Sequence, residues 1–167
     1  MLTITKIKLH NFKRFKDLTL DVNPDINIFI GDNESGKSTV LQAIDLVARG
    51  SRTRIENIGL DRLFNVESMT AFMNGDRNMS NPPELYIELY LENQTDPSLV
   101  GKNNSLEQLY SGIRLRCCFN EEYSKVVSEL LKDPNAPFPL EFYNISFDTF
   151  AGESFIAYSK KSDLLIH

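Results

Sequence analysis

The sequence predicts an α/β fold of the mixed α+β kind, in which a mixed sheet carries helices and includes an antiparallel β subdomain. Three observations predict it. Two alternating segments open the chain, a glycine-rich turn then joins an apolar strand to a helix-periodic segment, and two more alternating segments follow at residues 85–92 and 113–120. At 167 residues, with 41% hydrophobic and 25% charged residues, the chain suits one compact domain with a real core.

The first three strands are predicted from two different patterns. Leu18, Leu20 and Val22 alternate with polar residues, and residues 3–12 show a weaker form of the same period. After the turn Asn23-Pro24-Asp25, residues 26–30 form a nearly all-apolar run, which is typical of a strand buried on both faces. The chain therefore opens with two strands, and a third leads directly into Gly31.

Helices are predicted directly after the glycine-rich turn and again between positions 51 and 83. Val40, Leu41, Ile44 and Val47 recur at helical spacing, and Gly50 stands where a helix ends. Apolar residues between positions 51 and 83 indicate short helices, which Asn81-Pro82-Pro83 brings to a stop.

The second half of the chain is predicted to be mainly β. The alternating residues 85–92 and 113–120 indicate half-exposed, antiparallel strands, separated by a polar loop or insertion at 93–105. An amphipathic helix is expected over 123–131, a further strand over 138–150, and the start of a strand at 164–166.

Composition excludes several classes of protein. No apolar run approaches the roughly 20 residues of a membrane span, and no secretion signal opens the chain, so we expect a cytoplasmic protein without a membrane partner. The neighbours Cys117 and Cys118 should point to opposite faces of a strand as reduced structural thiols. The net charge of -5 argues against a chain devoted to coating nucleic acid. Five basic residues without an acid among the first sixteen could attract phosphate, or could simply form a solvated strand face.

One motif carries chemistry, and it spans the predicted turn between strand and helix. It reads Gly31-Asp32-Asn33-Glu34-Ser35-Gly36-Lys37-Ser38-Thr39, which is glycine, four residues and then Gly-Lys-Ser. This is the pattern of the phosphate-binding loop of P-loop NTPases. The alternative is a glycine-rich turn with an incidental lysine, but the apolar strand before the loop and the amphipathic helix after it favour the functional interpretation.

Each residue type in the motif has a mechanical reason. Gly31 lets the strand turn sharply, and Gly36 lets backbone N–H groups approach phosphate oxygens at the positive end of the helix. Lys37 would reach the β- and γ-phosphates of ATP as the catalytic charge, Ser38 would bind Mg²⁺, and Thr39 would support the α-phosphate region.

The chain also resembles a known group of proteins over its first fifty residues. The matching segments are Ile7 to Phe15, Leu18 to Val22, Ile26 to Gly31 and Asn33 to Thr39. They resemble the start of ABC-type ATPases of the SMC, RecF and OLD group. In that group an N-terminal Asn-Phe-(Lys/Arg) element packs near the nucleotide, so the resemblance implies a phosphate-side contact for Lys13. The loop residues Asn33, Glu34 and Ser35, followed by Gly-Lys-Ser, are most similar to the OLD (overcoming lysogenization defect) family of ATP-dependent endonucleases.

The resemblance implies that residues 1–167 form the N-terminal part of a single ABC-type ATPase head. Members of the group are longer and carry a signature motif, an acidic Walker B strand and, in OLD proteins, a Toprim nuclease domain, none of which is visible here. We therefore expect a binding-competent piece that is inactive alone, belonging to a DNA-cutting protein that works as a homodimer of ATPase heads.

Two alternatives stay open at this point. A RecF-like or SMC-like DNA-repair ATPase would share the same head without a nuclease. A GTPase would share the loop but needs Asn/Thr-Lys-x-Asp and Asp-x-x-Gly elements, and the nearest match, Lys160-Lys161-Ser162-Asp163, lacks the first residue.

Overall fold

One mixed sheet with helices packed on one face forms the body of the protein. The computed structural model describes residues 2–22, 34–92, 96–155 and 164–166. The hydrogen-bonded strand order is β2-β1-β3-β5-β4, with β6 also paired to β5 and β7 also paired to β1. Among the described strands only β7 runs parallel to its neighbour, and the other pairs are antiparallel. The mixed α/β class expected from the sequence is confirmed.

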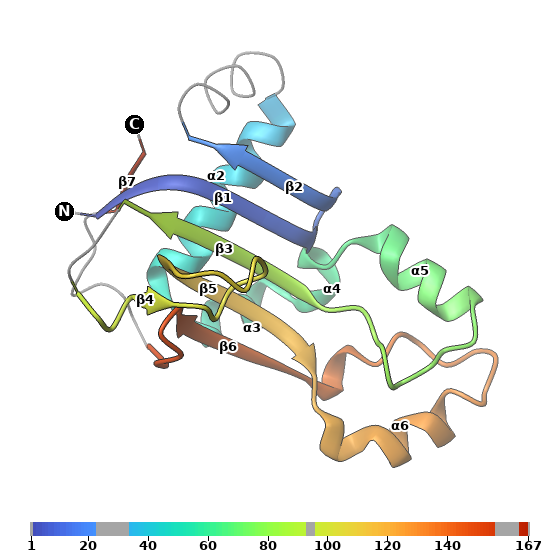
Figure 1. The fold of residues 1–167 in the computed structure, drawn as a ribbon. Coiled ribbons are helices and arrows are strands. Elements are labelled where there is room, and N and C mark those ends of the chain that lie inside the picture. Colours follow the sequence, from blue (N-terminus) through green and yellow to red (C-terminus); the bar gives the residue numbers. More distant parts are fainter. Residues whose placement is uncertain (1, 23–33, 93–95, 156–163, 167) are drawn as a thin grey trace.

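The elements follow one another in the order seen in Figure 1. The strands are β1 (Leu2–Phe12), β2 (Phe15–Asp21), β3 (Leu85–Leu91), β4 (Val100–Gly101), β5 (Tyr110–Phe119), β6 (Tyr143–Thr149) and β7 (Leu164–Ile166). The helices are α2 (Glu34–Arg49), α3 (Arg52–Ile58), α4 (Leu60–Leu63), α5 (Val66–Asn74) and α6 (Ser124–Leu130), with short 3₁₀ turns at Glu121–Tyr123 and Leu140–Phe142.

The core lies between the apolar face of the sheet and α2. The spacing of Val40, Leu41, Ile44 and Val47 correctly predicts this helix, but Leu41 is 42% exposed and Ile44 is only half-buried. The residues that α2 buries are Val40, Ala43, Leu46 and Val47. They form one hydrophobic cluster with the inward residues of the central strands, which are Ile7, Leu9, Ile87, Leu89, Ile113 and Leu115. Gly50 ends α2 with a φ of 56°, a left-handed conformation that favours glycine.

The opposite face of the sheet is polar, and its strand register places charges of alternating sign side by side. Lys8 pairs with Glu88, Glu88 with Arg114, and Arg114 with Asp148, across the four strands β1, β3, β5 and β6. Directly opposite side chains of unlike charge attract one another across a sheet. The register therefore aligns a charged row over the polar face.

The prediction that β3 is half exposed is wrong, because residues 102–108 fold over its polar face. We call this segment the strap. Glu88 is fully buried and Tyr90 is 2% exposed. Ser105 of the strap donates two hydrogen bonds to the Glu88 carboxylate, from its amide (2.7 Å) and its hydroxyl (2.6 Å). Residues predicted as a simple loop thus form a polar cover over the sheet.

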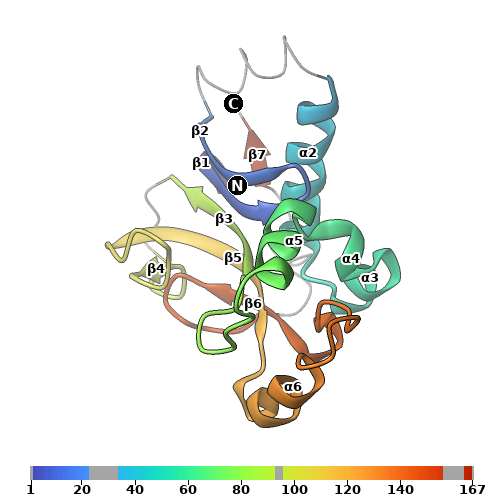
Figure 2. The ribbon, with the colours of Figure 1, turned by 90° about the vertical axis from the view of Figure 1, so that its right-hand side faces the viewer.

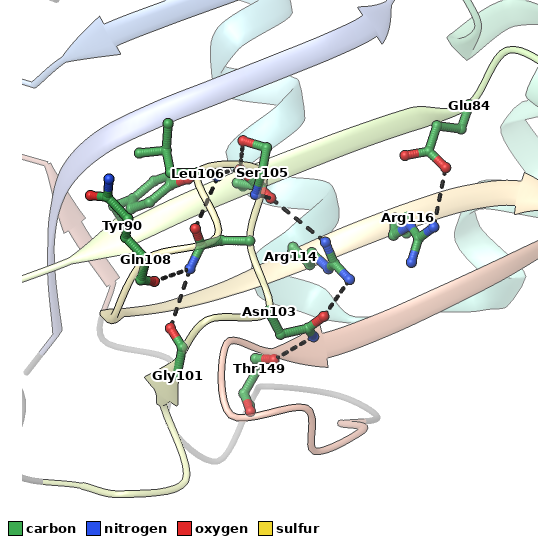
Figure 3. A network of polar contacts seen from close by, with 12 residues as sticks. Glu84, Tyr90, Gly101, Asn103, Ser105, Leu106, Gln108, Arg114, Arg116 and Thr149 are labelled. Carbon is green, nitrogen blue, oxygen red and sulfur yellow. Dashed lines mark hydrogen bonds and ion pairs between the residues drawn. The ribbon is translucent and has the colours of Figure 1, made fainter.

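Asparagines organise the strap, as Figure 3 shows. Asn104 donates to the carbonyl oxygens of Gly101 and Gln108, which closes the segment on itself. Asn103 accepts from Arg114 and donates to the Thr149 carbonyl, which ties the segment to β5 and β6. Burial raises the pKa of Tyr90, and burial together with the neighbouring charge of Arg116 lowers the pKa of Arg114.

Two predictions about the C-terminal half need correction. The strand expected over 138–150 begins only at Tyr143, because a 3₁₀ turn occupies Leu140–Phe142. The helix expected over 123–131 forms as α6, but it buries Val127 and Leu131 and leaves Tyr123, Val126 and Leu130 exposed. Only one narrow side of α6 therefore contributes to the core.

The short helices predicted between positions 51 and 83 are present as α3, α4 and α5. Figure 2 shows them together at one side of the sheet. Arg77, just beyond α5, donates to the carbonyl oxygens of Leu131 and Asp133, which joins this group to the end of α6. The strand predicted at residues 26–30 lies outside the described residues. Within the described part of the chain, no helix is both long enough and apolar enough to cross a bilayer.

Candidate phosphate-binding site

The second half of the predicted phosphate loop lies in the first two turns of α2. The helix begins at Glu34, so Gly36 and Lys37 lie in its first turn, and Ser38 and Thr39 lie in its second. Gly36 and Thr39 are buried, Lys37 is half-buried and Ser38 is exposed. The first turn of a helix has backbone N–H groups without partners inside the helix, and these favour an anion together with the positive end of the helix dipole.

The first half of the loop is described only in part. Gly31, Asp32 and Asn33 lie outside the described residues, and for Glu34 and Ser35 only the backbone within α2 is described. The cofactor-binding roles predicted for Gly31, Asn33, Glu34 and Ser35 therefore stay predictions. The structure shows the predicted helix, which begins at Glu34, two residues before Gly36 and inside the predicted loop.

Ser38 is the residue predicted to bind Mg²⁺, and its position suits that chemistry. Ser38 is exposed and lies directly after the first turn of α2. Among the described residues, no group of three or more His, Cys, Asp or Glu lies close enough to hold a metal ion. Magnesium commonly keeps several waters and binds phosphate oxygens with few protein ligands. One hydroxyl ligand would fit that pattern, and the Mg²⁺ role of Ser38 stays a prediction.

Lys13 lies in the tight turn between β1 and β2, where the backbone is in an unusual conformation. Its φ is 51°, and Asn11 two residues before it has a φ of 52°. These values lie in the left-handed region, which is uncommon for residues other than glycine. The Lys13 amide donates to the Leu63 carbonyl at 2.7 Å, and the Lys13 carbonyl accepts from Asn65 Nδ2 at 2.7 Å. Both backbone groups of Lys13 are therefore held by the segment between α4 and α5.

Two further side chains hold the same turn. The backbone amide of Asn65 donates to the Asn11 backbone carbonyl at 2.9 Å. The Asn65 side-chain oxygen Oδ1 accepts from the Ser68 backbone amide and so caps α5. The Ser68 hydroxyl donates to Asn11 Oδ1 at 2.6 Å, while Asn11 Nδ2 donates to the Glu84 carbonyl at 2.8 Å. We call Asn11, Asn65 and Ser68 the turn clamp. Asn11 and Asn65 are 5% and 4% exposed.

Sequence reasoning did not find the turn clamp. Asn65 and Ser68 carry one local signal, since Asn is a preferred N-cap residue. Their bonds to Asn11 and Lys13 span more than fifty residues and leave no periodic pattern.

The other basic residues near the N-terminus are spread along the sheet. Lys8 donates to the Thr19 hydroxyl at 3.2 Å, Lys16 pairs with Glu67 at 3.1 Å, and the Lys6 ammonium lies 5.9 Å from the Tyr90 ring centre. These contacts favour the plainer of the two interpretations, in which the basic residues form a solvated, locally paired surface.

Comparison with known protein families and sequences identifies relatives of this chain. A family model described as an AAA ATPase domain matches residues 2–164. The chain is 32% identical over 109 residues to a protein named DNA replication and repair protein RecF from Listeria welshimeri, an alignment that covers 63% of this chain and 27% of that protein.

Shorter alignments agree with this one. RecF of Lactococcus lactis subsp. cremoris is 44% identical over 52 residues, or 30% of this chain and 14% of that protein, and RecF of Limosilactobacillus reuteri is 33% identical over 72 residues, or 43% and 19%. The chain thus aligns with less than a third of the length of these curated relatives. No solved structure matches.

Proposed function

The chain belongs to the AAA ATPase domain family, and on that premise we propose that it binds ATP and Mg²⁺ through Gly31 to Thr39. The observation that carries the proposal is that the Gly-Lys-Ser sequence lies at the N-terminal end of α2, which begins at Glu34. Gly36 is buried near the N-terminal end of α2, and a glycine there adds no side chain between the helix end and an approaching anion. The match to an ATPase family supports the nucleotide as the anion.

Each residue of the site has a proposed task. The amides of the loop and of the first turn of α2, including Gly36, hold the phosphate chain. Lys37 places its charge against the β- and γ-phosphates, where it also offsets the negative charge that develops during phosphoryl transfer. Ser38 coordinates Mg²⁺ through its hydroxyl oxygen. Thr39 supports the α-phosphate side of the nucleotide. Lys13 adds a second positive charge from the β1–β2 turn. Bound Mg²⁺ would supply further charge neutralisation at the phosphates.

We propose further that the whole protein is an ATPase of DNA repair acting on DNA in the cytoplasm. Support comes from the relatives described above, which are named DNA replication and repair protein RecF. Residues 1–167 would then be the N-terminal part of one ATPase domain, inactive alone, and two such heads would assemble as a homodimer.

An OLD-family endonuclease is the second candidate. The favouring observation is Asn33-Glu34-Ser35 within the loop, the residues in which the resemblance to that family is closest. Protein expressed from the complete gene separates the candidates. Mg²⁺-dependent nicking of supercoiled DNA favours the endonuclease, whereas DNA-stimulated ATP hydrolysis without nicking favours the repair ATPase.

Titration calorimetry tests the nucleotide site directly. Wild-type chain should bind MgATP with measurable heat, and Lys37→Ala should lose most of that affinity while keeping its circular dichroism spectrum and melting temperature. The exposed Lys125→Ala on α6 is the matched control and should bind as wild type does. GTP should compete less well than ATP. A folded wild-type chain that gives no heat with MgATP would refute the proposal.

A further inference from the structure

The backbone of Lys13 is held in a left-handed conformation by a side chain from another part of the chain. A lysine in this region costs free energy unless the surroundings fix it, and such outliers cluster at binding sites. Here Asn65 Nδ2 fixes the Lys13 carbonyl at 2.7 Å and the Leu63 carbonyl fixes the Lys13 amide at 2.7 Å. The direction in which the Lys13 side chain leaves the turn is therefore set from outside the hairpin.

Asn65 performs two separable tasks with the two polar atoms of its side chain, Oδ1 and Nδ2. Oδ1 accepts from the Ser68 amide at 2.9 Å and caps α5, which is an ordinary structural role. Nδ2 donates to Lys13, which α5 does not need for its own formation. Because Asn65 is only 4% exposed, water cannot readily replace that donor.

The contacts of the turn clamp join Lys13 to β3 and α5 as one rigid unit. Asn11 reaches the Glu84 carbonyl just before β3, and Ser68 of α5 reaches Asn11. Figure 1 shows α2 running across the sheet behind the β1–β2 hairpin, so the unit is attached to the same sheet that supports the phosphate-loop helix. A cation that must meet a phosphate gains affinity when its backbone is fixed beforehand.

We propose that Asn65 is a positioning residue that sets the Lys13 turn for the nucleotide phosphates, a role that rests on the proposed function of the phosphate loop. Asn65 touches no nucleotide and acts only through Lys13. Its Nδ2 atom matters for binding, whereas its Oδ1 atom matters for the stability of α5.

Asn65→Asp separates the two tasks, because aspartate keeps the capping oxygen and replaces the donor by a second acceptor facing the Lys13 carbonyl. Asn120→Asp is the matched control, since Asn120 Oδ1 caps the 3₁₀ turn at Glu121–Tyr123 by accepting from the Glu122 amide and lies outside the turn clamp.

The decisive measurement is a double-mutant cycle of MgATP affinity on the 167-residue chain. Lys13→Ala should weaken binding about tenfold and Asn65→Asp by at least about threefold, the size expected when one charge-assisted contact is lost or misplaced. In the Lys13→Ala background, Asn65→Asp should cause no further loss, because its effect passes through Lys13. Asn120→Asp should match wild type.

The outcomes distinguish this inference from the proposed function. Wild-type affinity in folded Asn65→Asp, or equal losses in the presence and absence of Lys13, would overturn the positioning role and leave the phosphate loop untouched. A folded wild-type chain that binds no MgATP would overturn the proposed function itself, and the positioning role with it. Melting curves of all four variants report whether each one is folded.

Discussion

The carboxylate of Glu88, which has no exposed surface, accepts both the amide and the hydroxyl of Ser105, a residue seventeen positions later in the chain. The Tyr90 hydroxyl also donates to it at 2.8 Å, and Arg114 lies 3.7 Å away. A buried carboxylate is tolerated when its acceptor sites are filled in this way. Glu88 therefore holds the strap to β3, in addition to the bonds of Asn103 that tie it to β5 and β6.

Replacing Glu88 by Gln should destabilise the fold by about 3 kcal/mol, because the amide group cannot accept from all three donors and Arg114 loses its buried counter-charge. Urea unfolding followed by circular dichroism measures the change. Glu92→Gln, at an exposed position, is the control and should stay close to wild type. Equal midpoints for the two variants would show that the Glu88 contacts contribute little.

Gly112→Ala should destabilise the sheet where β5 passes Phe150. A methyl group there would overlap the Phe150 ring and lie 2.5 Å from the Leu89 carbonyl oxygen, closer than real contacts allow. Overpacking of this kind costs about 2 kcal/mol. Gly75→Ala, whose methyl would meet its nearest atom at 3.2 Å, is the matched control. A melting temperature of Gly112→Ala no lower than that of Gly75→Ala would contradict the packing described.

The two adjacent cysteines should differ sharply in reactivity. Cys117 is buried, and burial followed by the neighbouring Cys118 raises its pKa to about 12, while half-buried Cys118 has a pKa raised mainly by burial. At pH 8 iodoacetamide should modify Cys118 slowly and leave Cys117 intact, because the thiolate is the reactive form. Tandem mass spectrometry locates the label, and urea-unfolded protein is the control in which both react. Equal labelling in the folded chain would refute the burial difference.

The Cys117 thiol also predicts a pH dependence of stability. The unfolded thiol ionises near its ordinary pKa of 9.0, whereas the folded thiol keeps its proton until about 12. The unfolded state therefore binds fewer protons between these values, and the free energy of unfolding should fall as the pH rises across that range. Cys117→Ala should reduce this slope in urea unfolding between pH 8.5 and 10. A slope unchanged by the substitution would contradict the raised pKa.

Ser38→Ala should weaken MgATP binding about tenfold while leaving metal-free ATP binding nearly unchanged, because the hydroxyl is proposed to contact the ion and not the phosphates. Calorimetry with and without magnesium measures both affinities. Ser124→Ala at the start of α6 is the control. Equal losses with and without magnesium would assign Ser38 to the phosphates instead.

The sequence predicted those parts of the fold that follow one repeated pattern. The β1–β2 hairpin, α2 with its end at Gly50, and the antiparallel strands β3 and β5 were all predicted from alternation or helical spacing. The helix that carries the Gly-Lys-Ser motif was also predicted, although it begins two residues earlier, at Glu34.

The strap and the turn clamp could not be predicted, for the same physical reason. Alternation indicates that Glu88 and Tyr90 point away from the core, and they do, but it cannot show that residues 102–108 return to cover them. The clamp likewise depends on hydrogen bonds that side chains make to a backbone carbonyl or to another side chain more than fifty residues away. Such polar contacts follow the tertiary fold and carry no periodic signal.

The charged row formed by Lys8, Glu88, Arg114 and Asp148 has a consequence for folding. A slip of one residue in any of these strand pairs would turn that strand's charge toward α2 and its aliphatic side chains toward the polar face of the sheet. Each misaligned sheet would carry an ion into the interior without a counter-ion, at a cost of several kcal/mol. The charged row thereby disfavours sheets with the wrong strand register, while the apolar face supplies most of the stability of the fold.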